Sequence, residues 1–316
     1  MSKIYDLIIV GAGPAGLTAA IYGMRAELDT LLIEKNYMGG GQIINTYEID
    51  NYPGLPGLSG IELATKFSEH VDKLGAKRVE AEVSGLDLTG EVKKVFTDAG
   101  EYEGRTVIVC SGNSSSKLDV PGEEELAGMG VSYCATCDGA FFKNRTVAVI
   151  GGGDVAVEDA IFLARGCKKV YVVHRRDELR AAKSLQSALF ACENVEMVWN
   201  STVKEISGED MVERIIVTNT VDGSESELAV NGVFIAVGNV PNSTYVRGGS
   251  VKEELKAGEL LLDGRGYIVA GEDCVTNIDG VYAAGDVRTK MLRQVSTAVA
   301  DGANAVFSAE KYLIRS

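Results

Sequence analysis

One pattern occurs twice in this chain of 316 residues: a short apolar run, a glycine-rich turn, a helical stretch and a second apolar run. The first copy starts with the apolar run 7–10 and the second with 147–150, so the copies are 140 residues apart. Short apolar runs are typical of parallel strands that are buried on both faces of a sheet. The duplication therefore predicts an α/β chain made of two units of the same design.

The glycine spacing in both copies is that of a dinucleotide-binding turn. The first glycine allows the tight turn, the second lets backbone amides approach a pyrophosphate, and the third, where alanine is also accepted, lets helix pack on strand. The phosphates then lie at a helix N-terminus, which favours negative charge. One such turn is weak evidence, but two in register predict two dinucleotide sites. The predicted contact residues are Gly11, Gly13 and Gly16 in the first copy, and Gly151, Gly153 and Ala156 in the second.

The two copies differ where their second apolar run ends. The first copy has Glu34, which can accept hydrogen bonds from a ribose 2′-OH and would repel a 2′-phosphate. The second has His174 followed by Arg175, Arg176 and Arg180, and residues 165–183 carry seven Lys/Arg against two acids. Arginine suits bidentate phosphate contacts, although a solvated basic face is the alternative. We therefore expect an adenosine without a 2′-phosphate in the first site and NADPH in the second.

A carboxylate follows a later apolar run, at residues 281–286. In open α/β sheets ligands bind at the carboxyl edge of the strands, which is where Asp286 is expected. If the first site holds FAD, Asp286 could bind its ribityl hydroxyls. The alternative is that Asp286 caps a helix and serves structure alone.

Two cysteines, Cys134 and Cys137, form a C-x-x-C pair 14 residues before Gly151. In a cytosolic chain this spacing indicates a redox dithiol. Half of a zinc site is the alternative, but the chain has no second cysteine pair and only two histidines. Asp138 could relay a proton as thiol and thiolate interchange, or it could be a turn residue. Hydride from NADPH can reduce a flavin, and a flavin can pass two electrons to a disulfide, so the three parts together predict a disulfide reductase.

Composition narrows the class of protein further. The chain has 45 acidic and 31 basic residues, a net charge of −14, which argues against a nucleic-acid partner or an anionic membrane surface. Its apolar runs are of strand length, far short of the roughly 18 residues that span a bilayer. The first residues lack the features of a signal peptide, and six cysteines are not a secreted disulfide framework. We expect a cytoplasmic location.

Over essentially its whole length the sequence resembles the low-molecular-weight, bacterial-type thioredoxin reductase family. The stretches that carry the resemblance are 11–16, 39–42, 49–54, 134–139, 151–156, 174–180, 285–287 and 293–294. The resemblance implies two nested Rossmann-like domains of the pyridine nucleotide-disulfide oxidoreductase type. Residues 1–116 and 246–316 would form the FAD domain, and residues 117–245 would form the NADPH domain that carries the dithiol.

The resemblance also implies roles for single residues. Cys137 would be the sulfur nearer the flavin, Cys134 the sulfur that attacks the disulfide of thioredoxin or a thioredoxin-like protein, and Asp138 the acid/base. Family members are homodimers. The residues that fall where the family contacts FAD are Gln42, Asn51, Asp286, Arg293 and Gln294, and those that fall where it holds the NADPH 2′-phosphate are Arg175, Arg176 and Arg180.

The sequence departs from the family pattern at two places, and three other functions stay open. Val155 stands where the family usually has serine, which removes a possible hydroxyl contact near the NADPH phosphates. Residues 110–112 read Cys-Ser-Gly in place of the common Ala-Thr-Gly, so a hydrogen bond near FAD is expected to differ. The alternatives are a reductase for another partner, such as a peroxiredoxin-linked or glutaredoxin-like protein, a flavin-binding redox sensor, and a relative fed by ferredoxin. The last would have no need for Arg175 and Arg176.

Overall fold

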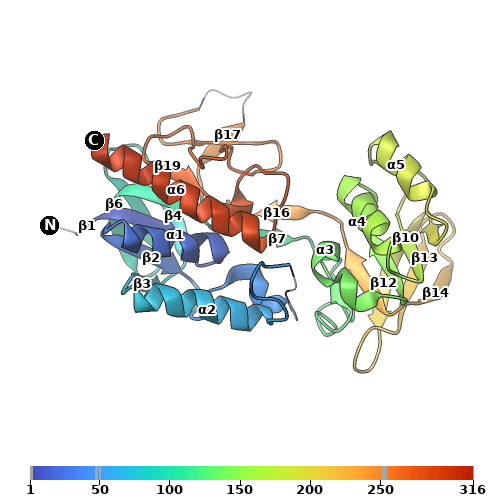
Figure 1. Cartoon of the computed structure of the whole chain (residues 1–316). Helices are drawn as coiled ribbons and strands as arrows, with labels where there is room; N and C mark the ends of the chain where they lie inside the picture. The colour runs from blue at the N-terminus through green and yellow to red at the C-terminus, as the bar shows by residue number, and fades with distance from the viewer. Residues whose placement is uncertain (1–2, 47–48, 50, 251–254, 316) are drawn as a thin grey trace. The chain divides into compact units, whose positions relative to one another are not determined.

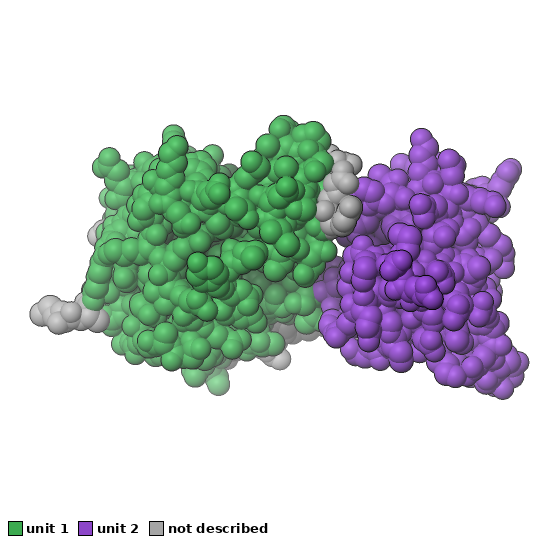
Figure 2. Space-filling model, turned by 90° about the horizontal axis from the view of Figure 1, so that it is seen from below, with its two compact units in different colours: residues 1–114, 240–316 green, residues 115–239 purple. Residues whose placement is uncertain are grey.

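The computed structural model describes residues 3–46, 49, 51–250 and 255–315. The chain divides into two compact units, which Figure 1 shows as ribbons and Figure 2 in two colours. Unit 1 comprises Met1–Ser114 and Val240–Ser316, and unit 2 comprises Ser115–Asn239. The chain passes from unit 1 to unit 2 after residue 114 and returns after residue 239. Both positions are slightly earlier than the boundaries expected after residues 116 and 245. No helix among the described residues is long and apolar enough to cross a bilayer.

Unit 1 is a sheet with helices packed against it. Its elements are β1 (Ile4–Val10), α1 (Pro14–Arg25), β2 (Thr30–Glu34), the 3₁₀ helix η1 (Gly41–Asn45), α2 (Gly60–Lys73), β3 (Lys77–Glu80), β4 (Val83–Asp87), β5 (Lys93–Thr97), β6 (Gly100–Val109), β17 (Gly248–Ser250), β18 (Leu260–Leu262), β19 (Val281–Ala283), η3 (Gly285–Val287) and α6 (Val295–Arg315). Two short strands, β7 (Asn113–Ser115) and β16 (Asn239–Pro241), pair with each other where the chain leaves and re-enters this unit.

The sheet of unit 1 has the strand order β3-β2-β1-β6-β5-β4, with β19 also paired to β6. Strands β1, β2, β3, β6 and β19 run parallel, whereas β4 and β5 are antiparallel additions. The long strand β6 pairs with both the antiparallel and the parallel strands: its residues 100–104 pair with β5, and its residues 107–109 pair with β19. The carboxyl ends of β1, β2, β6 and β19 therefore meet at one edge.

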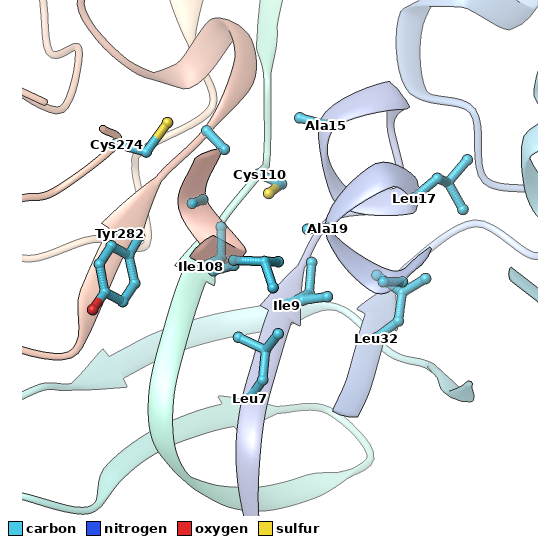
Figure 3. Close-up of a cluster of buried hydrophobic side chains, with 14 of the residues drawn as sticks. Leu7, Ile9, Ala15, Leu17, Ala19, Leu32, Ile108, Cys110, Cys274 and Tyr282 are labelled. Carbon is cyan, nitrogen blue, oxygen red and sulfur yellow. The ribbon is translucent and has the colours of Figure 1, made fainter. Parts of the chain in front are cut away.

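The central strands β1, β2 and β19 of unit 1 are buried on both faces over most of their length. Leu7 and Ile9 belong to a core cluster with residues of α1 and α6 on one face, and Figure 3 shows both beside Ala19 of α1. Ile8 and Val10 belong to a second core cluster on the other face. Side chains alternate between the two faces of a strand, so a continuous apolar run fits a sheet covered on both sides. This explains the apolar run that the sequence shows at residues 7–10.

Unit 2 repeats the arrangement. Its elements are β8 (Val131–Ser132), α3 (Ala135–Asp138), η2 (Gly139–Phe142), β9 (Thr146–Ile150), α4 (Asp154–Ala164), β10 (Lys169–Val173), α5 (Lys183–Phe190), β11 (Val195–Val198), β12 (Ser201–Ser207), β13 (Arg214–Asn219), β14 (Glu225–Ala229) and β15 (Gly232–Ile235). Strands β11-β10-β9-β15-β8 form a parallel sheet, and β12-β13-β14 form a separate antiparallel sheet.

The order β11-β10-β9-β15-β8 in unit 2 matches β3-β2-β1-β6-β19 in unit 1. The expected strand–turn–helix–strand units are both present, as β1-α1-β2 and β9-α4-β10. The predicted α/β fold with two Rossmann-like units is confirmed.

Candidate active site

Both glycine turns are tight, and each begins with a glycine at positive φ. Gly11 has a φ of 101° and Gly151 a φ of 154°, values that residues with a side chain rarely adopt. A Cβ atom on Gly11 would lie 2.5 Å from the carbonyl oxygen of Cys110, and one on Gly151 would lie 2.5 Å from that of Ala236. In each unit the turn thus presses against the chain leaving the neighbouring strand, and only glycine fits.

The second glycine of each turn faces open space. Gly13 and Gly153 precede α1 and α4 in extended conformation, and a Cβ on either would meet no atom within 4 Å. Neither helix start has a hydrogen bond from a capping side chain. Backbone amides in the first turn of a helix have no partner within the helix. Both turns therefore offer the open approach and the free amides that a pyrophosphate requires.

Glu34 is held in place at the end of β2. Its Oε2 accepts a hydrogen bond from the amide of Ala12 at 2.7 Å, and its Oε1 accepts one from the amide of Asn36 at 2.9 Å. Each carboxylate oxygen keeps a further lone pair. The side chain is thus oriented beside the first glycine turn and can still accept a hydrogen bond from a ribose hydroxyl.

Asp286 lies inside η3, directly after β19, and it is not the residue that caps this helix. Its Oδ1 is buried and has no hydrogen-bond partner among the described residues. Burial raises the pKa of Asp286, and Lys290 and Arg293 offset part of that increase. An orphaned acceptor at the carboxyl edge of the sheet fits a hydroxyl donor such as the ribityl chain of FAD.

Asp301 fixes this turn, and the sequence analysis did not single it out. Its Oδ2 accepts hydrogen bonds from the amide of Gly285 (2.9 Å), from Arg288 Nε (2.8 Å) and from Lys290 Nζ (2.8 Å), and its Oδ1 accepts one from Arg288 Nη2 (2.7 Å). All three charged side chains are at most 10% exposed. The signal for it was available in the sequence, because Asp301 interrupts the apolar face of a long helix.

The other predicted FAD-contact residues also belong to unit 1. Gln42 donates hydrogen bonds to Asn113, to its backbone oxygen and at 2.7 Å to Oδ1. Asn51 Nδ2 donates to Gln294 Oε1 at 3.0 Å. The guanidinium of Arg293 stacks 4.2 Å above the ring of Tyr267 and donates to backbone carbonyls of residues 286, 288 and 290. Asp50, within the matched stretch 49–54, lies outside the described residues.

In unit 2 His174 takes the place that Glu34 has in unit 1. Its ring is buried edge-on to Trp199, and its Nε2 has no hydrogen-bond partner in the described part of the chain. Burial lowers the pKa of His174, and Arg180, Arg175 and Arg176 lower it further. The side chains of these three arginines are exposed and close enough to act on one imidazole. These three arginines form a cluster of cations after β10, which could bind a 2′-phosphate.

Cys134 and Cys137 form a disulfide at the start of α3, with their Cα atoms 5.3 Å apart. Asp138 ends the same helix. Its Oδ2 accepts a hydrogen bond from the Ser132 hydroxyl at 2.6 Å, and its Oδ1 is buried without a partner among the described residues. The Ser132 hydroxyl also accepts from the amide of Cys134 at 3.1 Å, so this residue, which sequence reasoning missed, links the acid to the disulfide.

The pKa of Asp138 is raised because the carboxyl group is buried, and the Ser132 hydrogen bond lowers it by less. A carboxyl group with a raised pKa keeps its proton at a higher pH than an exposed one does. The arrangement can therefore hold a proton within the turn that carries the two sulfur atoms, which is what a dithiol–disulfide centre needs.

Comparison with known proteins agrees with this geometry. Residues 5–302 match the family model described as pyridine nucleotide-disulphide oxidoreductase. A thioredoxin reductase of Listeria monocytogenes is 48% identical over 312 residues, which cover 98% of this chain and 94% of that protein. A thioredoxin reductase of Peptoclostridium acidaminophilum is 43% identical over 320 residues, covering 99% and 98%. The crystal structure of a thioredoxin reductase from Streptococcus pyogenes superimposes with a TM-score of 0.91 at 43% identity and full coverage of both chains. The chain belongs to the pyridine nucleotide-disulphide oxidoreductase family and, within it, to the thioredoxin reductases.

Proposed function

We propose that this protein is an NADPH-dependent thioredoxin-disulfide reductase in which unit 1 holds FAD and unit 2 holds NADPH. The observation that carries the proposal is the Cys134–Cys137 disulfide with a buried acid beside it, in a chain that has two dinucleotide turns. Bound FAD would supply the two-electron chemistry that couples oxidation of NADPH to reduction of the Cys134–Cys137 disulfide.

The two cysteines then carry out the exchange with the protein substrate. The Cys134 thiolate attacks one sulfur of the thioredoxin disulfide, which forms a mixed disulfide and leaves the other thioredoxin sulfur as a thiolate. The Cys137 thiolate attacks Cys134 Sγ, which restores the Cys134–Cys137 bond and releases the second thioredoxin sulfur. Two electrons have moved from the dithiol to thioredoxin, whose two sulfurs take up two protons.

Asp138 is the proton donor and acceptor of this centre. Its carboxyl group lies in the same helical turn as Cys137, and burial keeps its pKa above that of an ordinary aspartate. Ser132 orients it through the 2.6 Å hydrogen bond to Oδ2, which leaves Oδ1 free to exchange a proton. Asp138 therefore protonates the sulfur that leaves when the disulfide opens.

The nucleotide contacts follow from the two turns. Gly11, Gly13 and Gly16 receive the FAD pyrophosphate, Glu34 accepts from the ribose, and Asp286 accepts from the ribityl chain. Gly151, Gly153 and Ala156 receive the NADPH pyrophosphate, while Arg175, Arg176 and Arg180 hold the 2′-phosphate beside His174. Gln42, Asn51, Arg293 and Gln294 complete the FAD site. On the family resemblance, we further propose a cytoplasmic homodimer.

The test is turnover of NADPH with thioredoxin and a chromogenic disulfide as the final acceptor. Cys134→Ser and Cys137→Ser should abolish this turnover, while NADPH still bleaches the bound flavin. Cys192→Ser, at a half-buried cysteine of the same unit, is the matched control and should keep turnover. Turnover that survives in either active-site variant contradicts the proposal. A wild-type protein whose flavin bleaches once without cycling would instead be a redox sensor.

A further inference from the structure

Tyr245 has a buried hydroxyl that nothing so far explains. Its ring packs against the second core cluster of unit 1, next to Val246. The phenol oxygen is shielded from solvent, and no described group accepts its hydrogen with hydrogen-bond geometry. Buried polar groups in native proteins are nearly always paired, and leaving one unpaired destabilises the fold. Among the described residues this donor therefore has no acceptor with hydrogen-bond geometry, although the Ser111 hydroxyl lies near it.

The hydroxyl lies at the carboxyl edge of the unit 1 sheet. Burial raises the pKa of Tyr245 above its ordinary value, the Ser111 hydroxyl offsets part of this, and Cys110 and Glu34 add to it. These neighbours follow β6 and end β2, the two strands that flank β1 and its glycine turn. The phenol thus stays protonated and stands between the strand ends where a dinucleotide binds.

The segment that carries Tyr245 is hydrogen-bonded to the same edge of the unit 1 sheet. The Ser111 hydroxyl donates to the carbonyl of Asn242 at 2.6 Å, and Asn242 Nδ2 donates back to the carbonyl of Ser111 at 2.9 Å. The amide of Asn242 donates to the carbonyl of Gly112 at 3.0 Å. The Ser111 hydrogen is therefore committed to Asn242, and the phenol is the hydroxyl donor that remains beside it.

We propose that the Tyr245 hydroxyl donates a hydrogen bond to the adenosine of FAD and so helps unit 1 select a flavin that carries adenosine. Adenosine offers acceptors in its ring nitrogens and its ribose oxygens. Glu34 supplies the complementary acceptor, since its carboxylate takes hydrogens from ribose hydroxyls. This inference rests on the proposed placement of FAD in unit 1.

The test compares Tyr245→Phe with Tyr282→Phe in the FAD-loaded full chain. Tyr282 is also buried in unit 1, but its hydroxyl donates to the carbonyl of Ser308 at 3.2 Å. Flavin fluorescence on dilution gives the Kd for FAD. Tyr245→Phe should raise this Kd about threefold to tenfold, the range expected for one hydrogen bond. Tyr282→Phe should leave it unchanged.

Competition with the two halves of the cofactor locates the contact. ADP and FMN are each used to compete with FAD for the site. Tyr245→Phe should weaken competition by ADP by the same factor as FAD binding and leave competition by FMN unchanged. An unchanged Kd for FAD, or a loss confined to FMN, overturns the inference.

The variant Gly13→Asp distinguishes a wrong role for Tyr245 from a wrong placement of FAD in unit 1. A Cβ atom on Gly13 would meet no atom within 4 Å, so we expect the variant to fold while its carboxylate occupies the phosphate approach. If Gly13→Asp loses FAD and Tyr245→Phe does not, the placement stands and the role of Tyr245 is wrong. If Gly13→Asp retains full FAD affinity, FAD is not bound at this turn.

Discussion

Replacing Asp301 by Asn should destabilise unit 1 strongly, because one buried carboxylate there neutralises two buried cations. Asp301 is 6% exposed, and its partners Arg288 and Lys290 are 10% and 7% exposed. The asparagine has nearly the same shape, so no cavity forms, but both cations lose their counter-charge. Breaking a buried ion pair in this way costs about 3–5 kcal/mol. That is a large part of the roughly 5–15 kcal/mol by which a domain is stable.

The assay is urea unfolding followed by circular dichroism, with flavin fluorescence recorded in parallel. Asp29→Asn is the matched control, since Asp29 pairs with Lys3 at 2.6 Å but is 40% exposed. Exposed pairs contribute little, so this variant should unfold almost as the wild type does. Asp301→Asn should also release FAD more readily, because Asp301 holds the amide of Gly285 next to Asp286.

Removing one cation should cost less than removing the shared anion. Lys290→Met leaves the two hydrogen bonds between Arg288 and Asp301 intact, at 2.8 and 2.7 Å, so its loss of stability should be smaller. This variant keeps the reasoning testable even if Asp301→Asn does not fold. Equal urea midpoints for Asp301→Asn and Asp29→Asn would refute the reasoning.

The stability that Asp301 contributes should depend on pH, and the direction of that dependence follows from its pKa. Burial raises the pKa of Asp301, but the hydrogen bonds from Arg288 and Lys290 outweigh it, so the pKa is lowered overall. A lowered pKa in the folded state gives stability that is present above the pKa of the unfolded chain and is lost as pH falls through the folded value. The difference in unfolding free energy between wild type and Asp301→Asn should therefore shrink in acid.

Three further predictions concern nucleotide binding and turnover. Arg175→Ala and Arg176→Ala should each weaken NADPH binding roughly tenfold to a hundredfold, because each loses one charge-assisted hydrogen bond. Both variants should leave NADH binding nearly unchanged. Equal losses for the two nucleotides in titrations would exclude a 2′-phosphate contact. Asp138→Asn should slow disulfide turnover at every pH, whereas the wild-type rate should fall as pH rises through the raised pKa of Asp138. Stopped-flow rates that depend on pH in the same way for both proteins would exclude a role of Asp138 in proton transfer. A reducible crosslink between unit 1 and unit 2 should stop thioredoxin reduction until it is cleaved. The dithiol and the predicted NADPH residues both belong to unit 2, and both must react with a flavin proposed for unit 1, so we expect the units to move during each cycle. A locked enzyme that turns over at the free rate argues against that motion.

The duplicated pattern made much of the fold predictable from sequence. The apolar runs and glycine spacing are local features, and they predicted β1-α1-β2 and β9-α4-β10. The antiparallel strands β4 and β5 were not anticipated, because their attachment to the N-terminal half of β6 depends on pairing across the sheet. The disulfide between Cys134 and Cys137 joins cysteines that the motif had already brought together.

Supporting residues of the candidate site were less predictable. Ser132 and Asp138 are six residues apart in sequence, and Arg288 and Asp301 are thirteen apart. Neither spacing is a motif, and each pair meets only because strand or turn geometry brings it together. Tyr245 is further away still from the strand ends that it faces. Such contacts are tertiary, so sequence patterns that report local structure do not reveal them.

The two copies of the nucleotide turn show how one backbone can be adapted to two ligands. In unit 1 the residue after the first glycine is Ala12, whose amide donates to Glu34. In unit 2 the equivalent residue is Gly152, and a Cβ there would lie 2.3 Å from the ring of His174. Replacing Glu34 by a buried imidazole therefore requires the loss of a methyl group opposite it. The pairs Ala12–Glu34 and Gly152–His174 thus fit different side chains against the same kind of turn. The negative charge at the strand end of unit 1 is replaced in unit 2 by His174 and the arginines that follow it.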